Sequence, residues 1–286
     1  MLKELVKIML IVLVFASVSG NYLYSQLQGS GTKSVPYLIF TKDELMQIEN
    51  HPGTPENLKY FVLKRNIRDS VRVPIAKIEN AVFDGQGYKI TLAIDDTIGY
   101  LTNAALFKIS FGNVEIKNLV VDGYVKGFWA SAILGDAVGR DDSTKPIQTT
   151  KLINNVNLAR ITGTVCASSL VHFGDDYDIM IADRNINLGT CEVFDNEYAM
   201  IGGFISHFDF GNGLKLGPGG LTISNSISAG FLNDRKGNGY TAGFLGRERI
   251  WGEIYSIPET NIFKSINTSV IISKGRRAPF VLIRQF

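Results

Sequence analysis

The chain has 286 residues, of which 45% are hydrophobic, so it is long enough to bury one large core or two smaller ones. Its 29 Lys and Arg residues nearly balance 27 Asp and Glu residues, and the formal net charge is +2. This balance argues against a nucleic-acid partner and against binding to an anionic membrane surface. The 29 glycines, 11 tyrosines and 17 phenylalanines, together with frequent β-branched residues after residue 60, indicate a β-rich protein.

Residues 1–20 have the order of a secretory signal peptide, with two lysines, an apolar run at 8–15 and small residues up to Gly20. The apolar run is short for a transmembrane helix. Cleavage fits after Ser19 or Gly20, and an uncleaved N-terminal anchor is the alternative. We therefore expect a secreted or cell-surface protein with no membrane contact beyond this segment.

Residues 21–36 are polar and contain glycine and serine, which predicts a linker. An N-terminal cap is expected at 37–58, because Thr41 stands three residues before Glu44 in a capping box and the apolar residues that follow end at 51–53. We expect one helix of about ten residues there. Its role would be to cover the first open strand edge of the domain that follows.

Residues 59–286 repeat a degenerate unit, in which a short apolar strand with asparagine and glycine precedes a strand of small residues. Paired segments of this kind lie at 116–123 with 131–136, 151–163 with 166–175, 184–190 with 199–209, and 221–230 with 240–248. Each unit is too small to bury its own apolar face, so the units must stack. The sequence therefore predicts an all-β parallel β-helix, or β-solenoid, preceded by the capping helix.

Asparagines mark equivalent places in these units. Aligning Asn118, Asn155, Asn185 and Asn225 gives spacings of 37, 30 and 40 residues. Side chains at one place in stacked parallel coils lie about 4.8 Å apart, which predicts a hydrogen-bonded asparagine ladder rather than a ligand site. The glycines of the second strands, as in AGFLG at 242–246, are expected to allow close packing at a bend.

The segment FDGQGYKI at 83–90 places Gly85 and Gly87 between two apolar strands. Glycines in such a position predict a turn with positive φ. Phe83 is expected to be buried under the first coils beside this turn.

The order of these motifs resembles that of the GLUG-motif proteins. FDGQGYKI is the best match, AGFLG at 242–246 is close to the family's signature, and the other late copies are eroded. The resemblance covers roughly residues 38–275. It implies a right-handed parallel β-helix of the pectate-lyase-like superfold in a secreted or surface-bound microbial protein, and a role in adhesion or surface display.

Acidic side chains follow the second strands along one edge of the expected helix. They are Asp136, then Asp175 with Asp176 and Asp178, then Asp209, and Arg247 with Glu248 in the last unit. Solvated acidic loops, with Arg140 and Arg184 supplying compensation, are the favoured interpretation. The alternative is a Ca²⁺ site in the loops around Asp175, because stacked carboxylates repel unless a cation intervenes. No calcium-binding loop motif occurs, so we assign no metal ligand.

Sequence signatures of enzymes are missing from the chain. It contains no H-E-x-x-H, G-x-S-x-G, P-loop or dinucleotide-binding motif, so we assign no catalytic or cofactor-binding residue. The three histidines, His51, His172 and His207, are each expected to be surface or packing residues. We expect a non-catalytic protein that binds a polysaccharide or another cell-surface polymer. A polysaccharide lyase or glycoside hydrolase on the same scaffold is the alternative, with Asp175 and Arg184 among its candidate residues.

Aromatic residues flank the second strands and offer a flat platform for sugar rings, although stacking within the core is the favoured interpretation. These residues are Phe128, Trp129, Tyr240 and Trp251. The two cysteines, Cys166 and Cys191, occupy different places in their units, which favours two buried thiols over a disulfide.

The C-terminal segments 261–275 and 278–286 predict two strands without a cap after them. An open apolar strand edge recruits another strand unless it is blocked. We expect this edge either to be covered by residues that fold back or to cause self-association.

Overall fold

The structure, a computed structural model, describes residues 26–98, 102–137, 147–175, 179–194, 196, 199–210, 220–235, 239–250, 259–273, 276–278 and 284–285. The expected signal segment at 1–20 lies outside these residues. So do Arg140, Asp176, Asp178 and Trp251 among the side chains that the sequence singled out.

Strands dominate the described residues and form two sheets, of 13 and 15 strands, in which paired neighbours run parallel. The first sheet contains β1 (Tyr37–Ile39), β2 (Lys59–Leu63), β4 (Ile75–Asp84), β7 (Phe107–Lys117), β9 (Leu134–Ala137), β10 (Thr149–Ile153), β13 (Val171–Asp175), β14 (Ile179–Asp183), β18 (Ile205–Phe210), β19 (Gly220–Ser224), β23 (Leu245–Ile250), β24 (Glu259–Phe263) and β28 (Arg284–Gln285). The second contains β3 (Ile67–Val71), β5 (Lys89–Asp96), β6 (Asn103–Ala104), β8 (Val120–Ser131), β11 (Val156–Asn157), β12 (Arg160–Ser168), β15 (Ile186–Asn187), β16 (Thr190–Val193), β17 (Met200–Gly202), β20 (Ile227–Ser228), β21 (Phe231–Asp234), β22 (Tyr240–Ala242), β25 (Ile266–Asn267), β26 (Val270–Ser273) and β27 (Arg276–Ala278).

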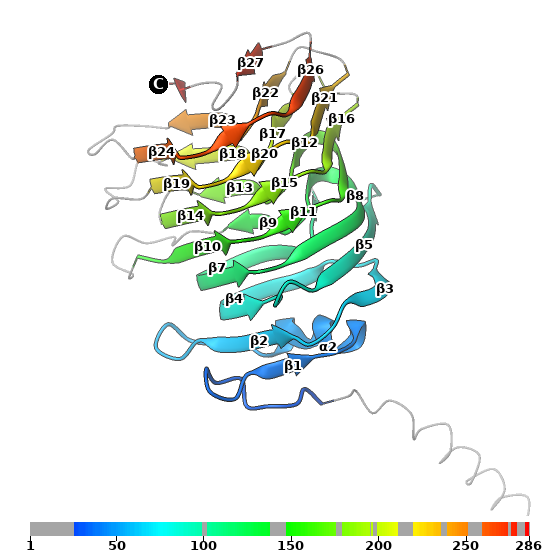
Figure 1. Cartoon of the computed structure of the whole chain (residues 1–286), viewed down its shortest axis with the longest axis vertical. Coiled ribbons are helices and arrows are strands. Elements are labelled where there is room, and N and C mark those ends of the chain that lie inside the picture. The colour runs from blue at the N-terminus through cyan, green and yellow to red at the C-terminus, as the bar shows by residue number, and fades with distance from the viewer. Residues whose placement is uncertain are drawn as a thin grey trace, which may run out of the picture.

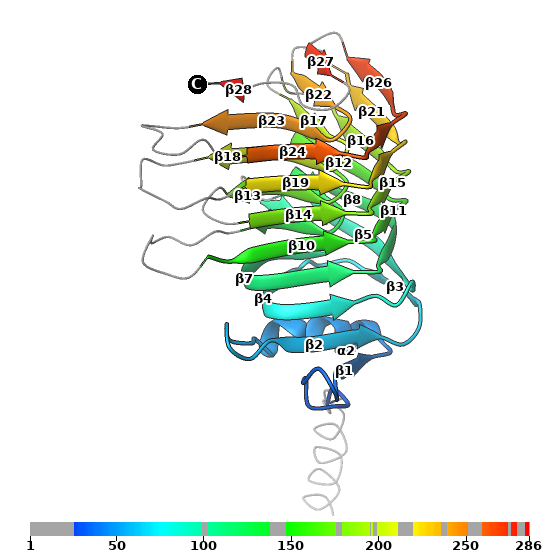
Figure 2. The ribbon, with the colours of Figure 1, turned by 60° about the vertical axis from the view of Figure 1, so that its left-hand side comes forward.

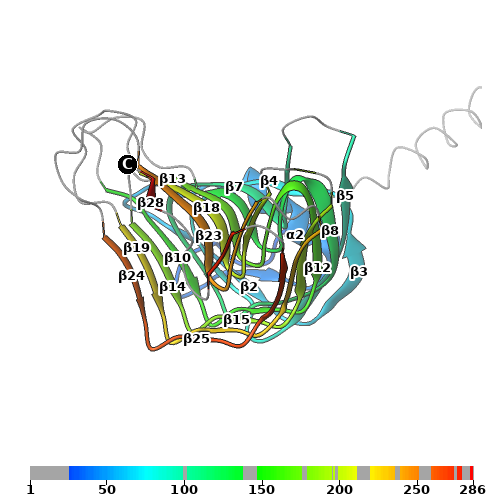
Figure 3. The same cartoon turned by 90° about the horizontal axis from the view of Figure 1, so that it is seen from above.

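The chain alternates between the two sheets as it advances along the stack (Figure 1). One coil runs from β10 in the first sheet through β11 and β12 in the second, and returns to the first sheet as β13. The next coil lays β14, β15, β16 and β18 directly against these strands. Seen along the stack, the sheets curl around an interior (Figure 3). The fold is all-β, and its curled parallel sheets are consistent with the predicted parallel β-helix.

One column of apolar side chains runs through the interior of the first sheet. Phe61, Phe83, Ile116 and Leu152 are in register on successive coils, and each is 0% exposed. Phe83 also meets Phe107 edge to face, with ring centroids 5.5 Å apart. The prediction that Phe83 is buried is confirmed, and burial of such a column along the axis is the main source of stability in stacked coils.

A short helix lies at the N-terminal end of the stack (Figure 2). It is α2 (Lys42–Met46), and a 3₁₀ helix, Gln47–Asn50, continues it. The predicted capping box is confirmed, because Thr41 Oγ1 accepts the backbone N–H of Glu44 and the Glu44 carboxylate accepts the backbone N–H of Thr41. These two bonds satisfy donors that a helix start otherwise leaves open.

Part of the segment expected to be a linker is folded. Leu27 is 5% exposed, Gln28 forms a bridge with Leu38, and Tyr60 donates its N–H to the carbonyl of Gly31. Strand β1, within the expected cap segment, already pairs parallel with β2. The stacked fold therefore begins before residue 59, the boundary drawn from the sequence.

The turn between β4 and β5 differs from the expectation in one detail. Gly87 and Gln86 have φ of 78° and 53°, but Gly85 is outside the left-handed region. A Cβ on Gly85 would lie 2.6 Å from the carbonyl oxygen of Asn118 and 2.7 Å from Cα of Leu119. The predicted positive φ at Gly85 is wrong, and the close approach of the next coil is what requires glycine there.

The asparagine ladder is present, but its register differs from the alignment of the sequence. Asn155 Nδ2 donates to Asn185 Oδ1 at 3.1 Å, and the N–H of Asn185 donates to Ser226 Oγ at 3.0 Å. Asn118 and Asn225 stand one residue earlier, at a corner with positive φ. That corner is occupied in successive coils by Asn118, Asn154, Arg184, Asn225 and Lys264. The ladder prediction is confirmed for Asn155 and Asn185, and Asn118 forms a second ladder at the corner, where its Oδ1 accepts Nδ2 of Asn154 at 2.8 Å. It is wrong for Asn225, which donates from Nδ2 to Asp183 instead.

Small residues form the second bend of each coil, as predicted. A Cβ on Gly203 would lie 1.8 Å from the carbonyl oxygen of Gly243 on the next coil. Earlier coils use serine at this bend, where Ser131 Oγ donates to the carbonyl of Leu134 and Ser168 Oγ donates to that of Val171, both at 2.6 Å. The bend is therefore too tight for larger side chains at these positions.

The C-terminal end of the stack consists of short strands. The strand expected at 261–275 is instead three strands, β24, β25 and β26, separated by the same corners as in earlier coils. Residues 279–283, which belong to the last expected strand, lie outside the described residues. Within the described part of the chain, no helix is long and apolar enough to cross a membrane.

Candidate functional site

The acidic row expected along one edge is only partly in register. Asp175 pairs with Asp209, which pairs with Arg249 on the next coil. Asp136 pairs with Phe173, two residues before Asp175, so its place in the row is wrong. Arg184, expected to compensate the row, contacts its neighbour Asp183 at 3.0 Å instead. Among the described residues, no group of three or more His, Cys, Asp and Glu side chains could hold a metal ion.

His172 is a packing residue, as predicted. Its ring stacks on Trp129 at 5.1 Å between centroids, and its Nδ1 lies 3.2 Å from Asp136 Oδ1. Asn103 donates from Nδ2 to the same carboxylate. Burial lowers the pKa of His172, and the bond with Asp136 opposes that effect. A polymer on the surface cannot reach this ring, because its side chain is only 5% exposed.

The aromatic residues do not form one platform. Trp129 and Tyr240 lie in one column, but Cys166 and Met200 separate them on the two intervening coils. Three coils correspond to about 14 Å along the stack. Stacking on His172 confirms the packing interpretation for Trp129.

Both cysteines are buried and unbridged, as predicted. The two cysteines belong to different columns of paired residues. Cys166 pairs with Trp129 and Met200, whereas Cys191 pairs with Ile161 and Leu232. Burial raises the pKa of both thiols. Neither is a nucleophile, because the reactive form of cysteine is the thiolate.

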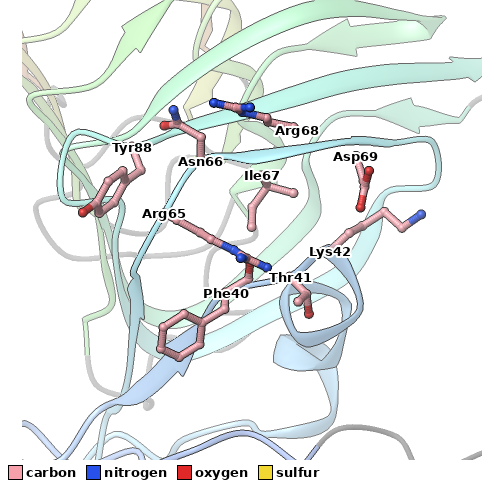
Figure 4. Close-up of a pocket in the computed structure, with 9 residues that line it drawn as sticks. All are labelled: Phe40, Thr41, Lys42, Arg65, Asn66, Ile67, Arg68, Asp69 and Tyr88. Atoms are coloured by element: carbon pink, nitrogen blue, oxygen red, sulfur yellow. The ribbon is translucent and has the colours of Figure 1, made fainter.

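An open pocket of ≈ 440 Å³ lies beside α2 at the N-terminal end (Figure 4). Three successive coils line it: the β1–α2 junction, the β2–β3 junction with β3, and the β4–β5 turn. The lining residues are Phe40, Thr41, Lys42, Arg65, Asn66, Ile67, Arg68, Asp69 and Tyr88. The sequence predicted none of them as a site residue.

A bulge in β3 shapes the pocket. Ile67 pairs with Ile90 and Val71 with Leu92, so the three residues at 68–70 lie opposite the single residue Thr91. Extra residues of this kind bend a strand and redirect its side chains. Ile67 and Val71 stay buried at 2% and 0% exposure, whereas Arg68 and Asp69 are exposed. The two ends of the bulge are therefore anchored in the core, and the centre of the bulge presents charged groups to the pocket.

Cationic groups dominate the lining. Lys42, Arg65 and Arg68 are present with a single carboxylate, that of Asp69. In the described part of the chain, no ion pair involves these three cations. Arg65 Nε donates to the carbonyl oxygen of Phe40, which fixes the guanidinium at the pocket's centre (Figure 4).

Two further side chains complete the lining. Asn66 Oδ1 accepts the N–H of Lys89 at 2.8 Å, which holds the amide in place and leaves its N–H groups as donors. Tyr88 is 37% exposed. An exposed aromatic ring beside fixed polar donors is a combination that binds a sugar through its apolar face and its hydroxyl groups.

One signal in the sequence points to this site in retrospect. β2 ends at Leu63, and the polar run 64–66 separates it from β3. That polar break supplies Arg65 and Asn66. The contribution of Tyr88, from a turn more than twenty residues later, has no local signal.

Comparison with known proteins shows the fold. No protein-family model and no curated protein matches the sequence. Among solved structures, the chain is similar to a Bacteroides ovatus protein provisionally described as an immunoglobulin A1 protease, with a TM-score of 0.57 and 14% sequence identity. The match covers 90% of this chain and 86% of the other. At this identity the likeness concerns the fold alone.

Proposed function

We propose that the protein is a secreted or surface-exposed, non-catalytic β-helix that binds a polysaccharide or another cell-surface polymer. The observation that carries the proposal is the pocket beside α2. It is open, it combines the exposed ring of Tyr88 with the polar groups of Asn66 and Arg65, and stacked coils hold those groups in place. Such a pocket accommodates one unit of a longer chain and leaves the flanking units outside.

The scarcity of carboxylates in the pocket lining supports a binding role. Glycoside hydrolysis commonly needs two carboxyl groups on either side of the scissile bond. Of the described lining residues, only Asp69 carries one. The pair of His172 and Asp136 is elsewhere and is packed under Trp129. A polysaccharide lyase or glycoside hydrolase remains the alternative function.

The proposal includes secretion, a right-handed coil and a capping role for α2. The resemblance to GLUG-motif proteins and the order of residues 1–20 support secretion and a right-handed coil, which is the usual hand of parallel β crossovers. We assign α2 the role of end cap, because Leu45 of α2 is 0% exposed and Ile48 after it is 2% exposed. These two apolar side chains cover the end of the stack, where a further coil would otherwise be needed to bury the interior.

A glycan array tests the proposal, with the unaltered chain compared with Tyr88→Ala and Tyr124→Ala. Tyr124 is the matched control, because it is also 37% exposed but lies on β8 outside the pocket. We expect saccharide binding that Tyr88→Ala weakens and Tyr124→Ala preserves. An array without binding, or equal loss in both variants, would contradict the proposal. Release of unsaturated or reducing ends from a bound polymer would establish the enzymatic alternative.

A further inference from the structure

We infer that the pocket beside α2 selects a saccharide unit that carries a carboxylate, with Arg65 and Arg68 as the groups that bind it. This inference rests on the proposed function and names the class of ligand. Its basis is the excess of cationic side chains over the single carboxylate of Asp69. A neutral sugar would leave these charges without an opposite charge, whereas an acidic sugar supplies one.

Arg65 is prepared for this contact. Its Nε donates to the carbonyl of Phe40, so the guanidinium plane is fixed before a ligand arrives. The terminal nitrogens keep the donors that match the two oxygens of a carboxylate. Fixing a long side chain in advance removes much of the entropy cost of binding.

Arg68 supplies a second cation from another direction. The bulge in β3 places it on the solvent side, one residue after buried Ile67. Figure 4 shows Arg68 on the β3 side of the pocket and Arg65 near its centre. A carboxylate between them would interact with both positive charges and would reduce the repulsion between the two guanidinium groups.

Asp69 limits the charge that the pocket accepts. Figure 4 places Asp69 and Lys42 together at the side of the pocket opposite Tyr88. A carboxylate there accepts hydrogen bonds from sugar hydroxyls and repels a second anionic group. The lining therefore favours a unit with one carboxylate over a heavily sulfated unit.

The test uses the full chain and three oligosaccharide probes: one that contains glucuronate, its carboxyl-reduced neutral counterpart, and a sulfated counterpart. Binding is measured by calorimetry at low and high salt. We expect the glucuronate probe to bind about tenfold more tightly than the neutral probe, which corresponds to one well-formed charged contact. We also expect weaker binding of the glucuronate probe at high salt.

Three variants locate the contact. Arg65→Gln and Arg68→Gln should each weaken glucuronate binding about tenfold, and Arg65→Lys should lose part of it because the charge stays and the fork is lost. Arg72→Gln is the control, since Arg72 is exposed just after β3 but does not line the pocket. Unfolding curves confirm that the variants fold, and Arg68→Gln keeps the test decisive if loss of the Arg65 contact disturbs the junction.

The outcomes separate the inference from the proposed function. Equal binding of the neutral and glucuronate probes would overturn the inference and leave saccharide binding intact. Preference for the sulfated probe would also overturn it. No binding of any probe, together with a blank array, would overturn the proposed function itself. Glucuronate binding that all variants preserve would place the site elsewhere, which would overturn the inference and leave saccharide binding by the protein intact.

Discussion

The two ends of the stack share one architecture and differ in what covers the interior. At the N-terminal end, the rings of Tyr37 and Phe61 pack at 5.5 Å between centroids, and Leu45 in α2 is fully buried. At the C-terminal end, Ile262 continues the same interior column but is only partly buried. A coil therefore buries its core only when another layer lies on each side of it.

The exposed residues of the last described coil reinforce this contrast. Phe263, Ile266, Val270 and Ile272 are between 48% and 59% exposed. Equivalent outward positions in earlier coils are shielded better, as for Val156 and Ile186, which pair along the same column as Ile266 and are half-buried. Substitutions of interior residues near each end test this difference in burial.

Phe83→Ala should destabilise the fold by about 3–5 kcal/mol, because a fully buried ring leaves a cavity between Phe61 and Ile116. Ile262→Ala, in the same column near the other end, should cost only about 1 kcal/mol because solvent already reaches that side chain. Urea unfolding measures both. Equal losses would show that the two ends are buried alike.

Asn185→Ala should cost about 2–3 kcal/mol. Asn185 accepts from the backbone N–H of Asn155 at 3.0 Å and donates to the carbonyl of Leu152 at 2.7 Å, so the substitution leaves buried groups without partners. Asn50→Ala is the control, an exposed position in the 3₁₀ helix, and should change stability by less than about 0.5 kcal/mol. If Asn185→Ala leaves the stability unchanged, water must replace the hydrogen bonds of the ladder.

Acid should destabilise the fold through His172. Burial lowers its pKa, so below about pH 6.5 the unfolded chain binds a proton that the folded chain does not, and stability falls as pH falls through that window. His172→Gln should flatten the decline in melting temperature between about pH 8 and pH 5.5. Burial also lowers the pKa of His51, which is more exposed, so His51→Gln should flatten the decline less. An unchanged slope in His172→Gln would refute the assignment.

Self-association through the C-terminal coil should be the weakest effect. We expect sedimentation to show concentration-dependent dimers or larger species, because β24, β25 and β26 are the outermost strands at this end of the described sheets. Ile272→Lys should reduce the association, whereas Val73→Lys, at an exposed valine far from this coil, should not. A strictly monomeric chain at all concentrations would show that the edge is guarded.

Elements that depend on a few neighbouring residues could be predicted from the sequence alone. The capping box needs only Thr41 and Glu44, three residues apart, and it forms as predicted. The repeated pattern of apolar and small residues was sufficient to predict stacked parallel coils, because such short units have no other way to bury an apolar face. Burial of Phe83 and of the two unbridged cysteines followed from the same periodicity.

The register between coils was decided by the tertiary structure. The corner with positive φ accepts Asn118, Arg184 and Lys264 alike, so asparagine alone does not mark one position, and the alignment slipped by one residue at Asn118 and Asn225. The acidic row failed at Asp136 for a related reason, since the lengths of bends and loops set which residues pair. One residue of slip changes the face that a side chain occupies.

The candidate pocket was beyond prediction from sequence for a physical reason. Arg65 and Arg68 come from one coil and Tyr88 from the next, and the three meet only because β3 pairs with β5 through a bulge. A charged residue in a polar break usually indicates a solvated loop, and nothing local distinguishes such a loop from the wall of a pocket. The types of strand and turn followed from local chemistry, whereas the site depends on which coils lie side by side, and only the packed chain determines that.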